Sequence, residues 1–145
     1  MKRLNGMIVG TALAVTALLS ACAGGSDMKQ LNATLSGSQE VPPVNSAGQG
    51  KAMLSLNTAT KQLTWKISYS GLSGDAAAAH IHGPAAPGAN AGVVVNLGAS
   101  GVKNPLEGSA TLTDAQIADL LAGKDYVNIH TAANKGGEIR GQVTP

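Results

Sequence analysis

The sequence predicts an all-β fold, an antiparallel Greek-key-like β-sandwich with one short helix. Several short segments alternate apolar and polar residues with the period of two that a half-buried strand shows. Turns rich in glycine and proline separate these segments at short intervals, and a single segment carries the signals of a helix start. A partly open β-barrel is the alternative, because short antiparallel strands with frequent turns build either architecture.

The first half of the chain contains the clearest strands. Residues 31–37 alternate and predict a strand, and the amide-lacking Pro42 and Pro43 prevent its continuation as a ladder. Residues 52–57 and 63–70 predict two further strands, joined by a turn. The expected core-facing residues of the second of these are Leu63, Trp65, Ile67 and Tyr69.

The next two segments are harder to assign. The four alanines in 76–82 suit a helix, but the Gly83-Pro84 stop favours a strand over the second half of this segment. Residues 92–97 form a β-branched run, which predicts a strand covered on both faces for part of its length. A loop of small residues separates the two.

The last third of the chain combines the helix with a hairpin. A strand is expected at 107–112, and a capping box of Thr113 and Gln116 then opens a helix that runs to Ala122. Gly123 ends it. Residues 126–131 and 138–143 predict two antiparallel strands joined by a glycine-containing loop.

The first residues of the chain have the pattern of a lipoprotein signal. Lys2 and Arg3 precede a short apolar run that ends at a lipobox-like Leu-Ser-Ala-Cys, with Cys22 as the lipidated residue. Cys22 is the only cysteine, and lipidation explains why an exported chain would keep it. We therefore expect a signal peptide at 1–21, a lipidated cysteine and flexible tether at 22–29, and one β-sandwich domain at 30–145.

This organisation predicts a protein of the cell envelope that is attached to a membrane by its lipid anchor. Ala23 follows the cysteine where an aspartate would retain a lipoprotein in the inner membrane of a Gram-negative cell, so the outer membrane is expected, facing the periplasm or the surface. Trp65, Tyr69 and Tyr126 are the only aromatic residues, and without the signal the chain is close to neutral. Nucleic-acid partners are therefore not expected.

Three histidines carry the most specific chemical signal, and the chain has no others. His80 and His82 are two apart on a predicted strand, so their side chains share a face about 7 Å apart at the backbone. His130 lies on another predicted strand. If all three converge, they suit a transition metal at about 2.0 to 2.1 Å, with copper or zinc as the candidates and weaker binding below about pH 6. Surface histidines bonded to loop carbonyls are the alternative.

Alternation also predicts what surrounds the histidines. Val127 and Ile129 should face the core, which leaves Asn128 and His130 on the opposite, polar face. Pairing of the last two strands would bring Glu138 near His130 and Arg140 near Asn128. Candidates for orienting an imidazole or forming an ion pair are Glu40, Asn128, Glu138 and Arg140. Asp75 is a further ligand candidate, although a turn-forming role suits it better.

Four ordered motifs resemble the CHRD domain. They are Leu-Ser-Gly-Ser-Gln-Glu-Val-Pro-Pro-Val at 35–44, Ala-His-Ile-His-Gly-Pro at 79–84, the segment 123–131, and Gly-Glu-Ile-Arg-Gly-Gln at 137–142. The resemblance covers 31–143 and implies a single β-sandwich module that bacteria often export or anchor to a membrane. The His-x-His strand is weakly similar to copper/zinc superoxide dismutase, another β-sandwich.

Two functions remain open from the sequence. The first is a lipid-anchored binding module that holds copper or zinc through His80, His82 and His130 for sequestration or delivery. The second is a structural or protein-interaction lipoprotein without a metal, in which the histidines only brace the sandwich. An enzyme is not expected, since no nucleophile elbow or paired carboxylates are recognisable.

Overall fold

The computed structural model describes residues 27–145. The predicted signal peptide and Cys22 lie outside the described residues. The elements are β1 (Met28–Ser36), the 3-10 turn η1 (Gly37–Gln39), β2 (Gln49–Asn57), β3 (Gln62–Ser70), β4 (Ala76–His82), β5 (Val93–Asn96), β6 (Leu106–Thr111), α1 (Asp114–Leu121), β7 (Tyr126–Thr131) and β8 (Ile139–Gln142). The expected all-β class with one short helix is confirmed.

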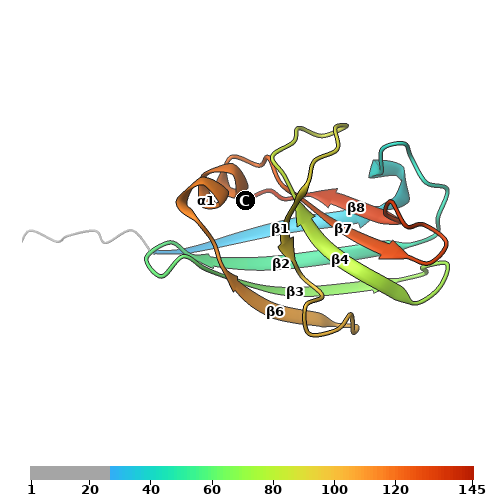
Figure 1. Ribbon diagram of the computed structural model, residues 1–145, viewed down its shortest axis with the longest axis horizontal. Coiled ribbons are helices and arrows are strands. Elements are labelled where there is room, and N and C mark those ends of the chain that lie inside the picture. The colour runs from blue at the N-terminus through green and yellow to red at the C-terminus, as the bar shows by residue number, and fades with distance from the viewer. Residues whose placement is uncertain (1–26) are drawn as a thin grey trace, which may run out of the picture.

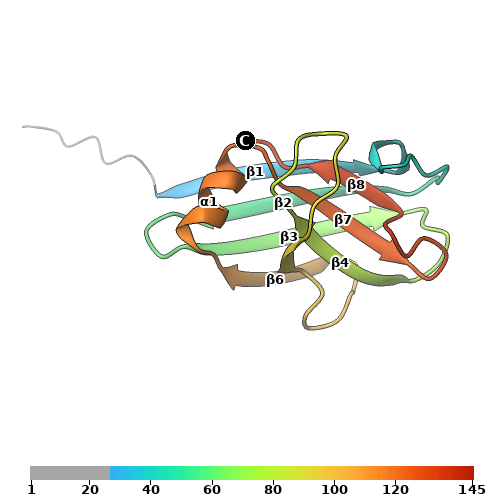
Figure 2. The ribbon, with the colours of Figure 1, turned by 45° about the horizontal axis from the view of Figure 1, so that its top comes forward.

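The eight strands form one antiparallel sheet in the order β5-β4-β7-β8-β1-β2-β3-β6. This sheet curls over itself, so that β4, β7 and β8 lie across β1, β2, β3 and β6 (Figure 1). The turned view in Figure 2 shows the same two layers meeting along β8 and β1. The protein is thus a sandwich made by folding a single sheet, and it combines the predicted sandwich with the nearly closed barrel that was the alternative.

The join between the two layers is narrow. The only residues paired between β8 and β1 are Arg140 and Ser36, and an isolated bridge between Asn32 and Thr144 extends the contact. A Cβ atom added at Gly141 would collide with the carbonyl oxygen of Thr34, so the backbones approach too closely here for any side chain. Close approach lets the sheet turn from one layer into the other.

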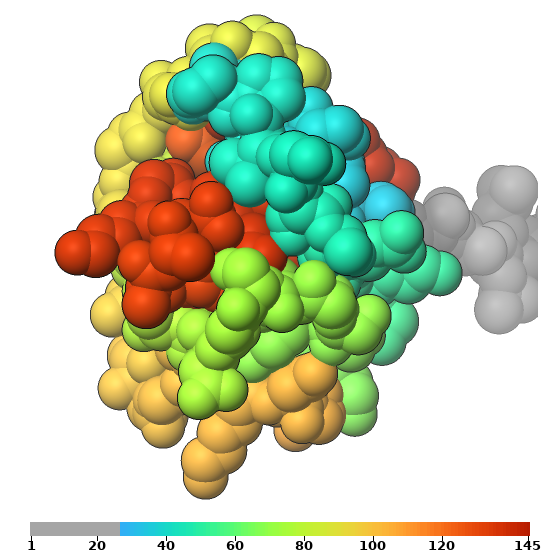
Figure 3. All heavy atoms as spheres, turned by 90° about the vertical axis from the view of Figure 1, so that its right-hand side faces the viewer, coloured from blue at the N-terminus to red at the C-terminus, as the bar shows by residue number. Residues whose placement is uncertain are grey.

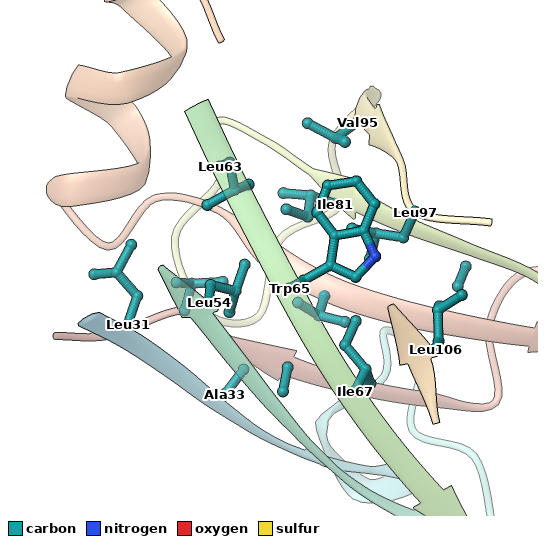
Figure 4. Packing of buried hydrophobic residues seen from close by; sticks show 14 of the residues in the cluster. Leu31, Ala33, Leu54, Leu63, Trp65, Ile67, Ile81, Val95, Leu97 and Leu106 are labelled. Atoms are coloured by element: carbon teal, nitrogen blue, oxygen red, sulfur yellow. The ribbon is translucent and has the colours of Figure 1, made fainter. Parts of the chain in front are cut away.

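The core lies between the layers and is built almost entirely from aliphatic side chains. In β3, Leu63, Trp65 and Ile67 are buried as alternation predicts, whereas Tyr69 at the end of the strand is only partly buried. Figure 4 shows the Trp65 indole beside Ile81 of the opposite layer. Each large side chain buried in this way contributes about 1.5 to 3 kcal/mol relative to an exposed one.

The alanine-rich segment is a strand over its whole length. β4 pairs with β5 on one side and with β7 on the other, and Ala79 and Ile81 are fully buried between the layers. The central ladder supplies the backbone bonds that outweigh the helix propensity of the alanines. The expected coverage of 92–97 on both faces for part of its length holds for Val94 and Val95, which are half-buried and buried. β5 is an edge strand, and Val93 is 56% exposed.

The helix begins and ends as expected. Thr113 accepts a bond from the backbone of Gln116, whose side chain accepts one from Thr113, and this completes the capping box. Gly123 adopts a positive φ of 69° just after the helix, and Leu120 anchors it in the core. No helix within residues 27–145 has the length and apolarity needed to span a bilayer.

Candidate metal centre

The pairing of β4 with β7 brings the three histidines onto one face of the sheet. His80 lies opposite Asn128, and His130 lies opposite Ala78, so His130 is the diagonal neighbour of His80. Their strand neighbours Ile81 and Ile129 are fully buried in the core. Because side chains alternate along a strand, the histidines point away from the core, as the sequence predicts. All three are half-buried.

One ring nitrogen from each histidine falls within 4.8 Å of the others. His80 Nδ1 is 3.1 Å from His130 Nε2, and the ring centroids of this pair are 5.0 Å apart. The His82 ring centroid is 5.5 Å from that of His80 and 5.8 Å from that of His130. Nitrogens on one tetrahedral ion lie about 3.3 Å apart, so ring movements of about 1 Å bring all three to a shared cation.

Two backbone carbonyls fix the orientation of two imidazoles. His82 Nδ1 lies 3.0 Å from the carbonyl oxygen of Ala91, and His130 Nδ1 lies 3.0 Å from that of Lys135. A carbonyl oxygen only accepts, so each Nδ1 carries a proton, and in the neutral tautomer Nε2 has the free lone pair. His130 Nε2 then accepts from His80 Nδ1. This is how outer-shell carbonyls orient histidine ligands in metalloproteins.

The Nε2 atom of His82 is buried and has no hydrogen-bond partner in the described part of the chain. Such an orphaned acceptor is unusual, since buried polar atoms nearly always find a partner. Burial and the neighbouring His130 and Arg140 lower the pKa of His82, against the raising effect of its carbonyl bonds. Burial and the charges of His130 and His82 also lower the pKa of His80. Both rings therefore favour the neutral, metal-binding form.

The side chains of Tyr126 and Arg140 form a stack against the His82 ring. The Tyr126 ring lies parallel to the His82 ring, with centroids 5.1 Å apart and planes inclined by 7°. The Arg140 guanidinium carbon sits 3.4 Å from the Tyr126 ring centroid. Since β7 lies between β4 and β8, His82 and Arg140 contact Tyr126 from opposite sides. The Ala91 amide donates to the Tyr126 hydroxyl, which ties the stack to the same residue that orients His82.

A model of the CHRD domain matches residues 31–143 of the sequence. The chain belongs to the CHRD family. No curated protein and no solved structure matched significantly. In this CHRD domain the four sequence motifs lie in or next to neighbouring elements. Segment 79–84 ends β4, 123–131 contains β7, 137–142 contains β8, and 35–44 contains η1 and Glu40, which bonds to Asn128 of β7.

Three of the four surrounding candidates lie together in this CHRD domain. Glu40 Oε1 accepts a bond of 2.5 Å from Asn128 Nδ2, and Asn128 pairs with Arg140 across β7 and β8. Arg140 is close enough to Glu40 for its charge to influence the carboxyl. Glu40, Asn128 and Arg140 thus form a buried polar cluster next to the histidines, although none contributes an atom to the histidine group itself.

Glu138 lies elsewhere, and the expectation that it would approach His130 was wrong. Its buried carboxylate accepts bonds of 2.6 to 2.7 Å from Ser46 Oγ, Thr131 Oγ1, and the hydroxyl and amide of Ser73. Thr131 follows His130 and so points to the other face of β7. The preceding Gly137 has a φ of 130°, which turns the chain before β8 begins. Asp75 is exposed in the turn before β4.

Sequence reasoning missed two parts of the centre. The orienting carbonyls of Ala91 and Lys135 belong to loops, and backbone oxygens carry no residue signature. The role of Tyr126 had a usable signal, because it occupies the same face of β7 as Asn128 and His130. A Tyr at that position, opposite His82 in the paired strand, is within stacking distance of the imidazole.

Proposed function

We propose that this CHRD domain binds a transition-metal cation, copper(II) or zinc(II), through His80, His82 and His130. The observation that carries the proposal is the convergence of three imidazoles from two strands, with one ring nitrogen of each within 4.8 Å of the others. Imidazole ligation suits both ions, and the Irving–Williams order favours copper where both are available. The role is binding for sequestration or delivery, and we propose no catalytic step.

The alternative, in which the histidines only brace the sandwich, accounts for fewer observations. Bracing explains the bonds of His82 and His130 to loop carbonyls. It leaves the buried Nε2 of His82 without a partner, and it gives no reason for two imidazoles whose pKa is lowered to lie against a third. A cation supplies the missing partner and replaces the His80–His130 contact with two stronger bonds.

Calorimetric titration of residues 27–145 with Cu(II) and Zn(II) tests the proposal. We expect one tight site in the parent and its loss in the His80→Ala/His82→Ala variant, with His130→Ala weakening binding as well. The matched control is Ser68→Ala/Ser70→Ala, a pair with the same spacing on exposed positions of β3. Equal, weak heats from the parent and the histidine variants would favour the bracing role.

We further propose that the domain acts at the cell envelope, attached to the membrane through lipid on Cys22. The support is the lipobox-like sequence and the single cysteine. Labelled palmitate should be incorporated into the full-length chain and not into the Cys22→Ser variant. Equal labelling of both chains, or of neither, would contradict the anchor and leave the metal site unaffected.

A further inference from the structure

A groove of about 410 Å³ is lined by Arg140, which stacks on Tyr126, and by none of the three histidines. Its walls come from two proline-containing loops, with Val41 and Pro43 on one side and Pro87 on the other. Figure 3 shows the teal chain that follows β1 in contact with the yellow loop that follows β4. Asn90 Nδ2 donates to the carbonyl oxygen of Val41 at 2.9 Å, and this bond holds the two walls together.

The groove is lined by two buried residues of opposite charge that are not paired with each other. Glu40 is 6% exposed and Arg140 is 2% exposed. The ion pairs among residues 27–145 join Lys61 to Asp114, Lys66 to Glu107, and Lys124 to Asp119. Neither Glu40 nor Arg140 belongs to one of them.

The partners that Glu40 and Arg140 do have are neutral. The guanidinium donates to the Ala89 carbonyl oxygen at 2.6 Å and to Asn90 Oδ1 at 3.0 Å, and it stacks on Tyr126. Two of its five N–H groups are therefore assigned in these bonds. Glu40 receives a bond from Asn128, and its burial raises the pKa of the carboxyl to about 7. Burying two charges without direct pairing is costly, and both groups line the groove, so a ligand there can bond to each of them.

The chemistry of that partner follows from the two groups. An anion would face Glu40 and a cation would face Arg140, so a neutral group is favoured. The group must donate to a carboxylate and accept from a guanidinium through adjacent atoms. A carboxamide does both, and its aliphatic flanks suit walls of valine and proline. The volume lies within the range of about 300 to 1,000 Å³ that is typical of small-ligand sites.

We propose that this groove binds a carboxamide, with its N–H donating to Glu40 and its carbonyl oxygen accepting from Arg140. The carboxamide can belong to a peptide backbone or to a small organic amide, since both present the same pair of atoms. The site uses none of the three histidines, and its test uses metal-free protein.

The experiment is a titration of the ¹⁵N-labelled protein in EDTA at pH 8, where the Glu40 carboxyl with a pKa of about 7 is mostly ionised, followed by NMR. The probes are N-acetyl-alanine methylamide for a peptide source, propionamide for a small amide, and N,N-dimethylpropionamide as a probe that lacks the N–H donor. We expect saturable shifts of the Arg140 side-chain Nε–H and of the Glu40 and Val41 amides with the first two probes only. Tighter binding of the alanine derivative assigns the site to peptides, and equal or tighter binding of propionamide assigns it to small amides.

Variants tie the binding to the two charges. Glu40→Gln keeps an acceptor for Asn128. We expect Glu40→Gln and Arg140→Gln each to weaken binding of the amide about tenfold, because each replaces a hydrogen bond to a charged group with a neutral one. Ser38→Ala, on the rim of the groove, should change affinity less than about twofold, within the range of a surface substitution. A dispersed spectrum shows that each variant is folded. Absence of saturable shifts, equal binding of the dimethyl probe, or unchanged affinity in both folded charge variants would overturn the proposal.

Discussion

At the scale of single residues, two buried glutamates show how the surroundings decide what a carboxylate does. Both Glu138 and Glu40 are almost inaccessible to solvent. Burial by itself raises the pKa of the Glu138 carboxyl, but its bonds from Ser46, Ser73 and Thr131 together lower it to about 2. Glu40 has a single bond from Asn128 and the nearby Arg140, and there burial dominates. The Glu138 carboxylate is stabilised by hydrogen bonds that link it to Ser46, Ser73 and Thr131. The Glu40 carboxyl, beside the groove, has a pKa raised by burial.

Glu138 should make the protein sensitive to acid. Its pKa is lowered from 4.5 to about 2 on folding, so the stabilisation is complete above pH 4.5 and is lost as the pH falls toward 2. We expect the free energy of unfolding to drop by about 3 kcal/mol across this interval relative to Glu138→Gln. Urea unfolding of both proteins at several pH values measures the difference. Glu107→Gln removes an exposed ion pair, and its free energy of unfolding should follow that of the parent almost in parallel over the same pH range.

Glu40 should have the opposite pH dependence. Its pKa is raised from 4.5 to about 7, so the folded state holds a proton that the unfolded state has released, and stability falls as the pH rises through this interval. Glu40→Gln removes this loss. As the pH rises from 4.5 to 7, we expect the free energy of unfolding of the variant to increase by about 2 to 3 kcal/mol relative to that of the parent. A constant difference between their unfolding free energies over that interval would contradict a raised pKa.

At the scale of elements, alternation predicted the strands of the first half of the chain and the two strands of the last hairpin, because each of these strands has one face on the core. The Gly83-Pro84 stop, the β-branched run at 92–97 and the capping box at Thr113 were needed for β4, β5 and the helix. Leu63, Trp65 and Ile67 are examples in which the period of two and burial agree. Alternation also placed the three histidines on faces turned from the core. It could not predict which strands are neighbours, and the site depends on β4 lying next to β7. Glu138 was misplaced because it precedes the regular ladder of β8, where Gly137 breaks the alternation.

The ends of β4 and β7 offer a test of packing between elements. Gly83 follows β4 and Asp125 precedes β7, and a Cβ atom at Gly83 would collide with Asp125 Oδ1. We expect Gly83→Ala to cost about 1 to 3 kcal/mol of stability, as overpacked sites do. In an Asp125→Ala background the same change should cost much less. Additive effects of the two substitutions in thermal or urea unfolding would show that the collision is relieved by another route.

At the scale of the whole molecule, the sheet holds three histidines that could bind a metal on its outer face. His80, His82 and His130 form the one group of potential ligands found among residues 27–145, and all three rings are half-buried. An ion bound by three imidazoles keeps at least one position for an outside ligand, as in metal sites that bind water or substrate. If the proposed cation binds, the half-buried rings leave one side of it open to solvent.

This open position leads to a prediction for the copper-loaded protein, and it depends on the proposed metal site. Azide added to the Cu(II) form should produce a saturable charge-transfer absorption and a changed electron paramagnetic resonance spectrum, because the anion takes the free position. The His130→Ala variant, with two imidazoles, should bind copper more weakly and show a different azide response. Spectra that azide leaves unaltered would mean that a fourth group from the protein already completes the coordination.

The pairing of β4 with β7 has a consequence for when the protein can acquire an ion. The His80-x-His82 pair emerges from synthesis or export fifty residues before His130, and two imidazoles on an unstructured chain bind only weakly. The third histidine reaches them only after the chain has passed through β5, β6 and α1 and β7 has paired with β4. If the proposed site is correct, tight binding of a cation requires the folded sheet, so the ion binds after folding and does not direct it.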